Sequence, residues 1–485
     1  MNTCFDYIFN HLIFHLLIII ISEPSSAYYA EALGTSDALS GIMIGLAPWF
    51  AMISSVVYSF WTNSNYKQPI LFAGMLQFIG NLLYANAYSY QSVGMCLLGR
   101  AITGLGAPRV INRRYVADAT PFCLRTAASA AFAMATAIGA AAGPGIAILL
   151  DSVDEFEFSL PFLATQYFNG MTGPGYLMSL IWLIYTIIIF FFFGEPVRSG
   201  LAELRQREEK AKSAKQESLL GTISVEADTE ELDVDETSYS SSLGEDYEQN
   251  RGDEAMFKNT TDSSEKGTRG YCSCMKNITR PVIICMSLIF MKRISLEAIV
   301  GSTSIITKNR YGWSIKNVGT LHLVNGIIVI PVSILSGYLS TSYEDRYMSL
   351  WCLSVTLFGM LFLFDPTDLL DHETSYTYND SPFAVGPKAY ITGSLIAFSG
   401  IEACESFVAS LMSKVVPSAL AQGTFNSGLL ATLVGTGGRA VGDLFITCMG
   451  LLSIRNLLNL LIIPGASLVG VSIALILWNY DLLGV

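Results

Sequence analysis

The chain has 485 residues, of which 52 % are hydrophobic and 14 % are charged, and its formal net charge is −12. A mean hydropathy of +0.46 excludes a soluble globular protein of this size and indicates an integral membrane protein. Apolar runs of about 20 residues recur, and in lipid such runs form helices because backbone polar groups must be satisfied within the protein. The lack of alternating apolar and polar residues excludes a membrane β-barrel.

Twelve membrane spans are expected, six on each side of a long polar segment. The first begins close to Met1, but it has no basic start and no convincing cleavage site, so we interpret it as a span rather than a signal peptide. The predicted fold class is therefore an all-α membrane protein. The expected spans are 5–21, 39–60, 69–88, 92–111, 126–150, 175–193, 281–306, 318–339, 348–364, 387–412, 425–451 and 456–480.

The polar segment at 195–280 is rich in Ser, Glu and Asp, which is typical of a disordered linker. It holds 19 acidic and 12 basic side chains, so it supplies −7 of the formal charge of −12. The overall acidity therefore does not predict a cationic substrate. The expected organisation is an N-terminal half at 1–194, the linker at 195–280 and a C-terminal half at 281–485.

Lysine and arginine in short loops predict the orientation, because cytosolic loops are enriched in these residues. With both termini in the cytosol, the inner loops hold Lys67, Arg113, Arg114, Arg125 and Lys414. The opposite side then collects acidic residues, among them Glu31, Asp37, Asp151, Asp365 and Asp368, with Lys308, Arg310 and Lys316 as basic exceptions. We therefore expect both termini to be cytosolic.

A basic cluster follows the fourth span, and two interpretations of it stay open. One is anchoring of the stretch 109–125 at anionic lipid headgroups. The other is a cytosolic lock between the two halves, built from Asn112, Arg113, Arg114, Tyr115 and Asp118. Glu344, Asp345 and Arg346 would form the corresponding lock in the second half. In the fifth span, Gly143 and Pro144 would allow close packing and a kink, as a moving gate requires.

Charged residues inside the expected spans require an explanation, because a charge in the membrane costs several kcal/mol and usually faces a cavity. Two pairs of opposite charge are spaced four residues apart, so each pair can meet on one helix face. They are Arg293 with Glu297 and Arg439 with Asp443. One interpretation is that these pairs neutralise each other and hold the second half together. The full set is Arg100, Lys292, Arg293, Glu297, Glu402, Glu405, Arg439 and Asp443.

Arg100 does not fit that interpretation, because its own span offers no carboxylate within reach. It lies about 15 Å from the polar turn at 89–90, near the middle of a hydrocarbon layer about 30 Å thick. Its partner is expected from the substrate or from another helix, such as Glu402 or Glu405. Arginine binds phosphate and carboxylate oxygens bidentately, so Arg100, Arg293 and Arg439 predict an oxyanion site. The carboxylates expected to temper its positive field and to carry protons are those of Glu297, Glu402, Glu405 and Asp443.

The sequence shows no catalytic apparatus. Its four histidines have no metal-ligand spacing with cysteines or carboxylates, and its nine cysteines do not indicate a disulfide framework. It contains no phosphate-binding loop, nucleophile elbow or HExxH motif. We therefore expect no enzymatic activity, no metal, no cofactor and no nucleic-acid partner.

Six spans, a long cytosolic linker and six more spans resemble the layout of the major facilitator superfamily, in which two six-helix halves rock around a central site. The segment GRAITGLGAPRVINRRYVADATP at 99–121 is similar to the SPX-MFS proteins, the vacuolar phosphate transporters of plants and related eukaryotes. Further agreement lies at YAEALG (29–34), FIGNLLYA (78–85), SAAFAMATAIGAAAGPGIAILL (129–150), RYGW (310–313), YEDR (343–346) and QGTFNSGLL (422–430).

One departure from this family is large. Its members begin with a soluble SPX domain that senses inositol pyrophosphates, whereas the first expected span here starts within ten residues of Met1. Regulation by inositol pyrophosphates is therefore not carried over. The same core is also similar to lysosomal members of the superfamily that lack SPX and whose solute is less certain.

The resemblance and the buried arginines together predict transport of inorganic phosphate between the cytosol and a vacuole-like lumen by alternating access. The expected setting is a monomer in a vacuolar or lysosome-like membrane, with protons as a candidate coupling ion. Two alternatives stay open. One is a transporter or channel for another anion, such as chloride or a small carboxylate. The other is a membrane sensor that does not transport and uses the linker as its binding arm.

Overall fold

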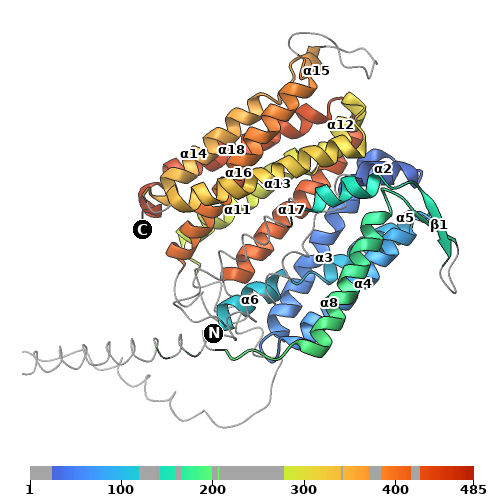
Figure 1. The fold of residues 1–485 in the computed structure, drawn as a ribbon. Coiled ribbons are helices and arrows are strands. Elements are labelled where there is room, and N and C mark those ends of the chain that lie inside the picture. Colours follow the sequence, from blue (N-terminus) through green and yellow to red (C-terminus); the bar gives the residue numbers. More distant parts are fainter. Residues whose placement is uncertain are drawn as a thin grey trace, which may run out of the picture.

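The computed structural model describes residues 25–119, 139, 142–159, 165–198, 202, 206, 278–339, 342–370, 384–416 and 427–484. The first expected span, most of the fifth and nearly all of the linker lie outside these residues. The division into halves at 194 and 281 therefore stays a prediction. The described chain is a bundle of helices in which an N-terminal group lies beside a C-terminal group (Figure 1).

The N-terminal group consists of helices and one small sheet. Its elements are α2 (Ser26–Ala32), the 3₁₀ helix η1 (Asp37–Leu39), α3 (Ser40–Trp61), α4 (Lys67–Asn86), α5 (Val93–Leu105), α6 (Arg109–Ala119), an apolar helix at Ala142–Asp151, β1 (Phe156–Ser159), β2 (Thr165–Phe168) and α8 (Gly173–Phe192). The strands form an antiparallel hairpin in which Phe156 pairs with Phe168. The sequence interpretation, which expected helices alone, did not predict this hairpin.

The expected span at 92–111 is divided in two, which corrects the prediction of one continuous helix. Helix α5 ends at Leu105, and α6 begins at Arg109 after Pro108. Proline has no N–H to donate to the preceding turn, but its carbonyl can start the next helix, and Pro108 O accepts from Asn112 N at 3.1 Å. The basic cluster therefore lies on a separate helix with its own direction.

The C-terminal group contains α11 (Arg280–Val300), α12 (Thr303–Tyr311), α13 (Ile315–Leu339), α14 (Asp345–Leu361), α15 (Thr367–Leu370), α16 (Pro387–Val415), α17 (Ser427–Leu452), α18 (Leu457–Trp478) and the 3₁₀ helix η4 (Asp481–Leu483). The expected span at 281–306 is likewise divided, at Gly301 and Ser302, into α11 and α12. The other expected spans of this half agree with the observed helices to within three residues at each end.

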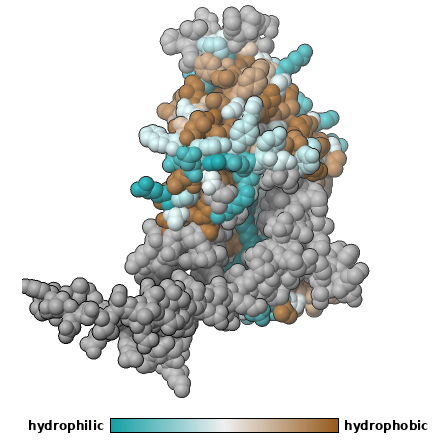
Figure 2. Space-filling model, turned by 90° about the vertical axis from the view of Figure 1, so that its left-hand side faces the viewer, coloured by the Kyte–Doolittle hydropathy of each residue, from teal (hydrophilic) through white to brown (hydrophobic). Residues whose placement is uncertain are grey.

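Six described helices are long and apolar enough to cross a membrane, at Asp37–Trp61, Gly173–Phe192, Ile315–Leu339, Pro387–Met412, Gly428–Leu452 and Leu457–Trp478. Apolar side chains cover much of the described surface in Figure 2. Large apolar residues such as Phe191 and Ile334 are about 70 % exposed, at 71 % and 69 %. Such a surface is costly in water and is expected of helices that face lipid.

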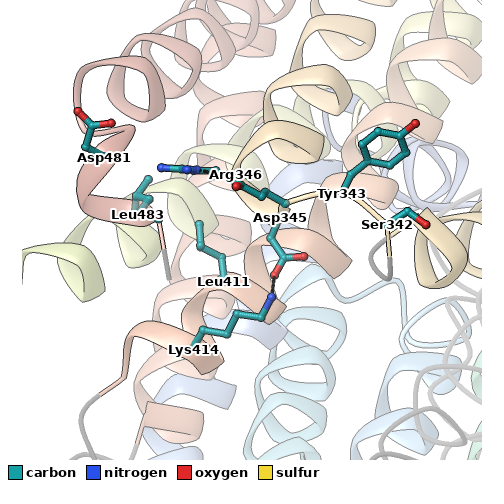
Figure 3. Close-up of a pocket in the computed structure, with 10 residues that line it drawn as sticks. Ser342, Tyr343, Asp345, Arg346, Leu411, Lys414, Asp481 and Leu483 are labelled. Carbon is teal, nitrogen blue, oxygen red and sulfur yellow. Dashed lines mark hydrogen bonds and ion pairs between the residues drawn. The ribbon is translucent and has the colours of Figure 1, made fainter.

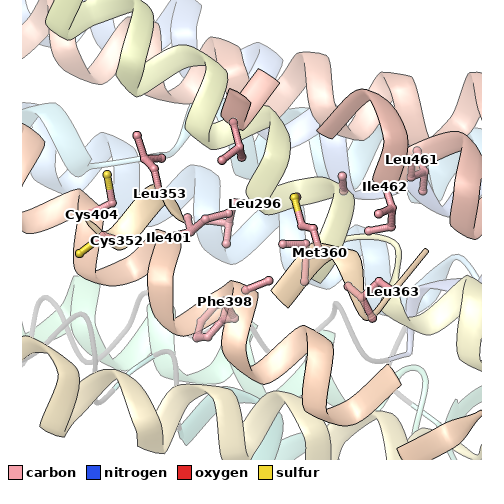
Figure 4. Close-up of a cluster of buried hydrophobic side chains, with 14 of the residues drawn as sticks. Leu296, Cys352, Leu353, Met360, Leu363, Phe398, Ile401, Cys404, Leu461 and Ile462 are labelled. Atoms are coloured by element: carbon pink, nitrogen blue, oxygen red, sulfur yellow. The ribbon is translucent and has the colours of Figure 1, made fainter. Parts of the chain in front are cut away.

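The largest buried apolar cluster of the described residues lies mostly in the C-terminal group, between α11, α14, α16 and α18 (Figure 4). Leu296, Leu353, Met360, Ile401 and Leu461 belong to it, and each is at most 6 % exposed. This packing fixes α11 and α16 beside each other, which places their charged residues on neighbouring helices.

The two groups meet where α3 packs against α17, and glycines make this contact close. A Cβ atom on Gly45 would lie 2.5 Å from Asp443 Cβ, and one on Gly41 would lie 2.5 Å from Asp443 O. Any larger residue at these positions of α3 would push the helices apart. Asp443 is fully buried in this contact.

Candidate functional site

A cavity of about 260 Å³ lies between α6 of the N-terminal group and α11, α16 and α17 of the C-terminal group. Its position at the junction of the two groups is the expected place for a solute that both groups must contact. The residues that line it are Arg109, Arg113, Ile289, Arg293, Glu405, Ala409, Met412, Val416, Gly428, Ala431, Thr432, Gly435 and Thr436.

Three guanidinium groups reach this cavity. Arg109 and Arg113 are four residues apart on α6, so they share one helix face, and Arg293 approaches from α11. Arg113 Nη1 donates to Thr432 Oγ1 at 2.6 Å, a hydrogen bond that joins the two groups of helices. Arg109 lies within electrostatic range of Arg113 and Arg293. Among the described residues, no hydrogen-bond or ion-pair partner of Arg109 is present.

Glu405 is the acidic residue in the described lining of the cavity. Its Oε2 accepts from Lys292 Nζ and lies 3.1 Å from Arg293 Nη2. The Lys292 side chain is 2 % exposed, whereas that of Glu405 is 33 % exposed. Lys292 therefore lies behind the carboxylate, and Glu405 faces the open space.

These contacts correct the predicted pairing within α11. Arg293 does not pair with Glu297, as their spacing predicted, but with Glu405 on α16. Glu297 instead lies 3.3 Å from Arg439 Nε, on α17. Packing of α11 against α16 and α17 brings Glu405 to Arg293 and Arg439 to Glu297, so ion pairs across helices replace the predicted local one.

Arg100 contacts two neighbouring helices of the N-terminal group. Its Nε donates to Met43 O of α3 at 2.9 Å, and its guanidinium lies 5.7 Å from the centre of the Tyr84 ring. The predicted approach of Glu405 to Arg100 is not observed, since Glu405 is held by α11. Five of the predicted substrate-binding residues are outside the lining of the described cavity, namely Arg100, Glu297, Glu402, Arg439 and Asp443.

The opposite end of the junction is closed by contacts between the two groups. Lys308 on α12 lies 2.6 Å from Glu31 Oε2 and 2.9 Å from Asp37 Oδ2. The Ser26 and Ser304 hydroxyl oxygens are 3.2 Å apart, and Tyr28 donates to Trp313 O. Figure 1 shows α2 and α12 together at this end and α6 at the other. Lys308 was a basic exception on the side that was expected to collect acidic residues. Its ion pairs with Glu31 and Asp37 connect the two groups of helices at this end.

The residues predicted to form the lock after the fourth span contact their own group of helices, apart from Arg113. Arg114 donates to Ser59 O and Asn63 Oδ1, and it lies 3.4 Å from Asp118 Oδ2. Asp118 also accepts from the Tyr66 hydroxyl at 2.7 Å. Burial and the Asp118 carboxylate raise the pKa of Tyr66, so this hydroxyl stays a proton donor.

The remaining two residues of this predicted lock are buried. Tyr115 packs edge-on against Tyr66, with ring centres 5.3 Å apart. Asn112 is 2 % exposed, and its Nδ2 has no hydrogen-bond partner among the described residues. The gating role of these two residues stays a prediction.

The second predicted lock lies at the start of α14 (Figure 3). Asp345 Oδ2 lies 2.7 Å from Lys414 Nζ on α16. Arg346 lies 2.6 Å from Glu344 Oε2 and donates to Tyr480 O at 2.6 Å. These contacts connect α14 with α16 and with the end of α18, all within the C-terminal group.

Gly143 and Pro144 lie at the beginning of the described helix at Ala142–Asp151, and both are buried. A Cβ atom on Gly319 of α13 would lie 3.4 Å from Pro144 O. This helix therefore packs closely against the C-terminal group, as small residues permit. The predicted kink would involve residues 140 and 141, which lie outside the described part of the chain.

Three polar residues of the cavity lining were not assigned to a site by the sequence interpretation: Arg109, Thr432 and Thr436. Arg109 was recognised as part of a basic cluster, but a continuous fourth helix would have placed it at the membrane surface. The i,i+4 spacing of Arg109 and Arg113 after Pro108 is the signal that could have indicated a shared face turned inward.

Two groups of apolar helices around a charged cavity, closed at one end, form the arrangement that is typical of membrane transporters for small solutes. The chain belongs to the Major Facilitator Superfamily, whose family model matches residues 7–442. The predicted superfamily fold is thereby confirmed.

Its curated relatives include SPX domain-containing membrane proteins of plants, which confirms the resemblance found in the motifs. One from Arabidopsis thaliana is 32 % identical over 446 residues, covering 92 % of this chain and 59 % of the relative. One from Oryza sativa subsp. japonica is 31 % identical over 469 residues, covering 95 % and 62 %. The chain thus spans less than two thirds of the length of these relatives.

Solved structures with a similar fold include a D-xylose–proton symporter, with a TM-score of 0.60, 11 % identity and 97 % of each chain covered. A POT family transporter in complex with a thioalcohol-conjugated peptide has a TM-score of 0.60 and 12 % identity, with 99 % of this chain and 95 % of that chain covered. At these identities the likeness supports the fold alone.

Proposed function

We propose that this protein moves inorganic phosphate between the cytosol and a vacuole-like lumen, and that phosphate binds in the cavity between α6, α11, α16 and α17. The observation that carries the proposal is the convergence of Arg109, Arg113 and Arg293 on one small cavity. Guanidinium forks match the geometry of phosphate oxygens and bind them in pairs. The relatives are SPX domain-containing membrane proteins, which agrees with the resemblance from which phosphate transport was predicted.

The charges of the cavity suit a doubly charged anion. Its described lining carries three arginines and one glutamate, which leaves an excess of two positive charges. Thr432 and Thr436 add hydroxyl groups that can donate to further anion oxygens. Monohydrogen phosphate carries two negative charges at neutral pH and has oxygens on all sides, so it can use each of these donors.

The closed end and the cavity at the other end suit alternating access. The contacts of Lys308, Ser26 and Tyr28 hold the groups together at the α2–α12 end, while the cavity lies towards α6. With both termini in the cytosol, the cavity faces the cytosol and the closure faces the lumen. Rocking of one group against the other would break the closure and release the anion on the lumenal side.

Purified protein in liposomes tests this function. Labelled phosphate should accumulate above the level of protein-free liposomes, and arsenate should compete because it has the same shape and charge. Protein with a verified melting transition that shows neither accumulation nor competition would contradict the proposal.

A second candidate is transport of another anion, and the same arginines support it. A guanidinium pairs with a carboxylate as readily as with a phosphate, so the cavity alone does not select between them. Patch recording of enlarged vacuoles in single-anion solutions separates the candidates. Phosphate transport predicts currents or fluxes with phosphate that chloride and small carboxylates do not reproduce.

A further inference from the structure

A second cavity, of about 580 Å³, lies at the start of α14, where this helix meets the end of α16 and the η4 segment (Figure 3). It is separate from the proposed phosphate site, and none of the described residues lines both cavities. Its lining carries charges of both signs. The basic side chains are Arg346 and Lys414, and the acidic ones are Glu344, Asp345 and Asp481. The proposed function leaves this cavity unexplained.

Exposed aromatic side chains place the second cavity at the level of the lipid headgroups. Tyr343 lines it and is exposed, and Trp478, at the end of α18 just before η4, is 90 % exposed. Tyrosine and tryptophan are enriched where membrane-spanning helices meet the membrane–water interface. Helix α18 is long and apolar enough to cross a membrane. The cavity at its end therefore lies where a lipid presents its polar headgroup.

A stripe of exposed aromatic residues leads from this cavity along α14. The Tyr343 ring stacks on that of Tyr347 with ring centres 6.3 Å apart, and the Tyr347 ring lies edge-on to Trp351 at 6.4 Å. Phe358, about two turns further on, is also exposed. Such an apolar stripe on a membrane helix faces lipid tails. A lipid whose headgroup fills the cavity can therefore lay an acyl chain along these rings.

Ion pairs and the C-terminal segment hold the walls of the second cavity in place. Lys414 Nζ donates to Asp345 Oδ2 at 2.7 Å, and Arg346 Nε donates to Glu344 Oε2 at 2.6 Å. Arg346 also donates to Tyr480 O at 2.6 Å, and its guanidinium lies 4.1 Å from the centre of the Tyr480 ring. These contacts fasten η4 to α14. Because the walls are already ordered, a ligand does not have to order them on binding.

The charges of the second cavity select the headgroup. Each of the two cations has an acidic partner, and Asp481 is a third acid that has no ion-pair partner among the described residues. The described lining thus has an excess of one negative charge. From these charges and the aromatic stripe we infer that the cavity binds the headgroup of phosphatidylethanolamine, with an acyl chain on the stripe. This inference goes beyond the proposed function and does not depend on which anion is transported.

Each part of that headgroup has a partner of the right chemistry. The Lys414 side chain is 46 % exposed and can donate to the lipid phosphate. The Glu344 side chain is 63 % exposed, and it and Asp481 can accept from the primary ammonium. Phosphatidylcholine has no N–H to donate to these carboxylates. Phosphatidylglycerol has no ammonium and would bring a net negative charge to a lining that is already negative.

Native mass spectrometry of the purified protein, titrated with lipids of identical acyl chains, tests the inference. We expect the wild type to bind phosphatidylethanolamine about tenfold more tightly than phosphatidylcholine or phosphatidylglycerol, because charge-assisted hydrogen bonds to the ammonium separate these lipids. The double variant Glu344→Gln with Asp481→Asn removes both ammonium acceptors, so this preference should disappear. Glu157→Gln with Asp154→Asn makes the same changes at exposed positions beside and within the hairpin, and it should keep the preference.

Thermal melting gives the second readout. Phosphatidylethanolamine should raise the melting temperature of the wild type and of the control variant above the value in phosphatidylcholine, but it should not do so for the double variant. If the double variant does not fold, Asp481→Asn alone must lower the preference, because this exposed carboxylate takes no part in the ion pairs that hold the walls.

Three results would overturn the inference. They are equal affinities of the wild type for phosphatidylethanolamine and phosphatidylcholine, an unchanged preference in a folded double variant, and tighter binding of phosphatidylglycerol than of phosphatidylethanolamine. None of these measurements involves phosphate. A protein that binds the lipid as expected but transports no phosphate would contradict the proposed function alone.

Discussion

Oxidation of a protein that carries Ser26→Cys and Ser304→Cys should stop phosphate uptake, and reduction should restore it. The two hydroxyl oxygens are 3.2 Å apart across the closed end, so sulfur atoms in their place can form a bond. A disulfide there would join α2 to α12 and prevent the separation that alternating access requires. We expect uptake to fall to the level of protein-free liposomes while labelled phosphate still binds, because the cavity lies at the other end.

Each single cysteine variant is the matched control, since the chain has cysteines of its own and one of them, Cys448, is exposed. Oxidised single variants should transport as well as reduced ones. Unchanged uptake by the oxidised double variant, with the cross-link shown by mass spectrometry, would mean that this end does not open during transport.

The variant Arg109→Met should weaken phosphate binding by about ten- to a hundredfold, since a charge-assisted contact contributes roughly 1.5 to 3 kcal/mol. The same change should leave the melting temperature unchanged or raise it. Arg109 lies among the like charges of Arg113 and Arg293, so its removal relieves repulsion. Loss of affinity with a gain of stability is typical of a residue retained for function.

Arg109→Lys separates charge from geometry. Lysine keeps the positive charge but not the planar fork, so its affinity should lie between those of the wild type and Arg109→Met. Arg455→Met, in the loop between α17 and α18, is the control for loss of an arginine outside the cavity. Titration with labelled phosphate gives the affinity of each variant, and a melting curve on the same samples gives its thermal stability. A lower melting temperature with normal affinity would assign Arg109 to the scaffold.

The helices were predictable because long apolar runs have few alternatives in a membrane. Helices α13, α16, α17 and α18 lie close to their predicted bounds. The breaks after Leu105 and Val300 were not predicted, because the apolar pattern continues through them and hydropathy does not register a local change of direction. Pro108 was the visible signal for the first break.

The candidate site was predictable in composition but not in arrangement. The sequence identified Arg293 and Glu405 as buried charges, and it identified Arg113 as part of a basic cluster. It could not show which helices would be neighbours, so Arg293 was paired within its own helix and Glu405 was directed towards Arg100. Partner choice depends on how α11 packs against α16, and that packing is decided by apolar contacts far along the chain.

Electron cryo-microscopy of the protein in saturating phosphate shows directly whether phosphate binds in the cavity between α6 and α17. We expect density for one tetrahedral anion within hydrogen-bond distance of Arg109, Arg113 and Arg293, with the Glu405 carboxylate turned away from Arg293. Wild-type protein in chloride alone is the matched control. Density for phosphate at Arg100 or Arg439, with the cavity between α6 and α17 empty, would contradict the proposed phosphate site.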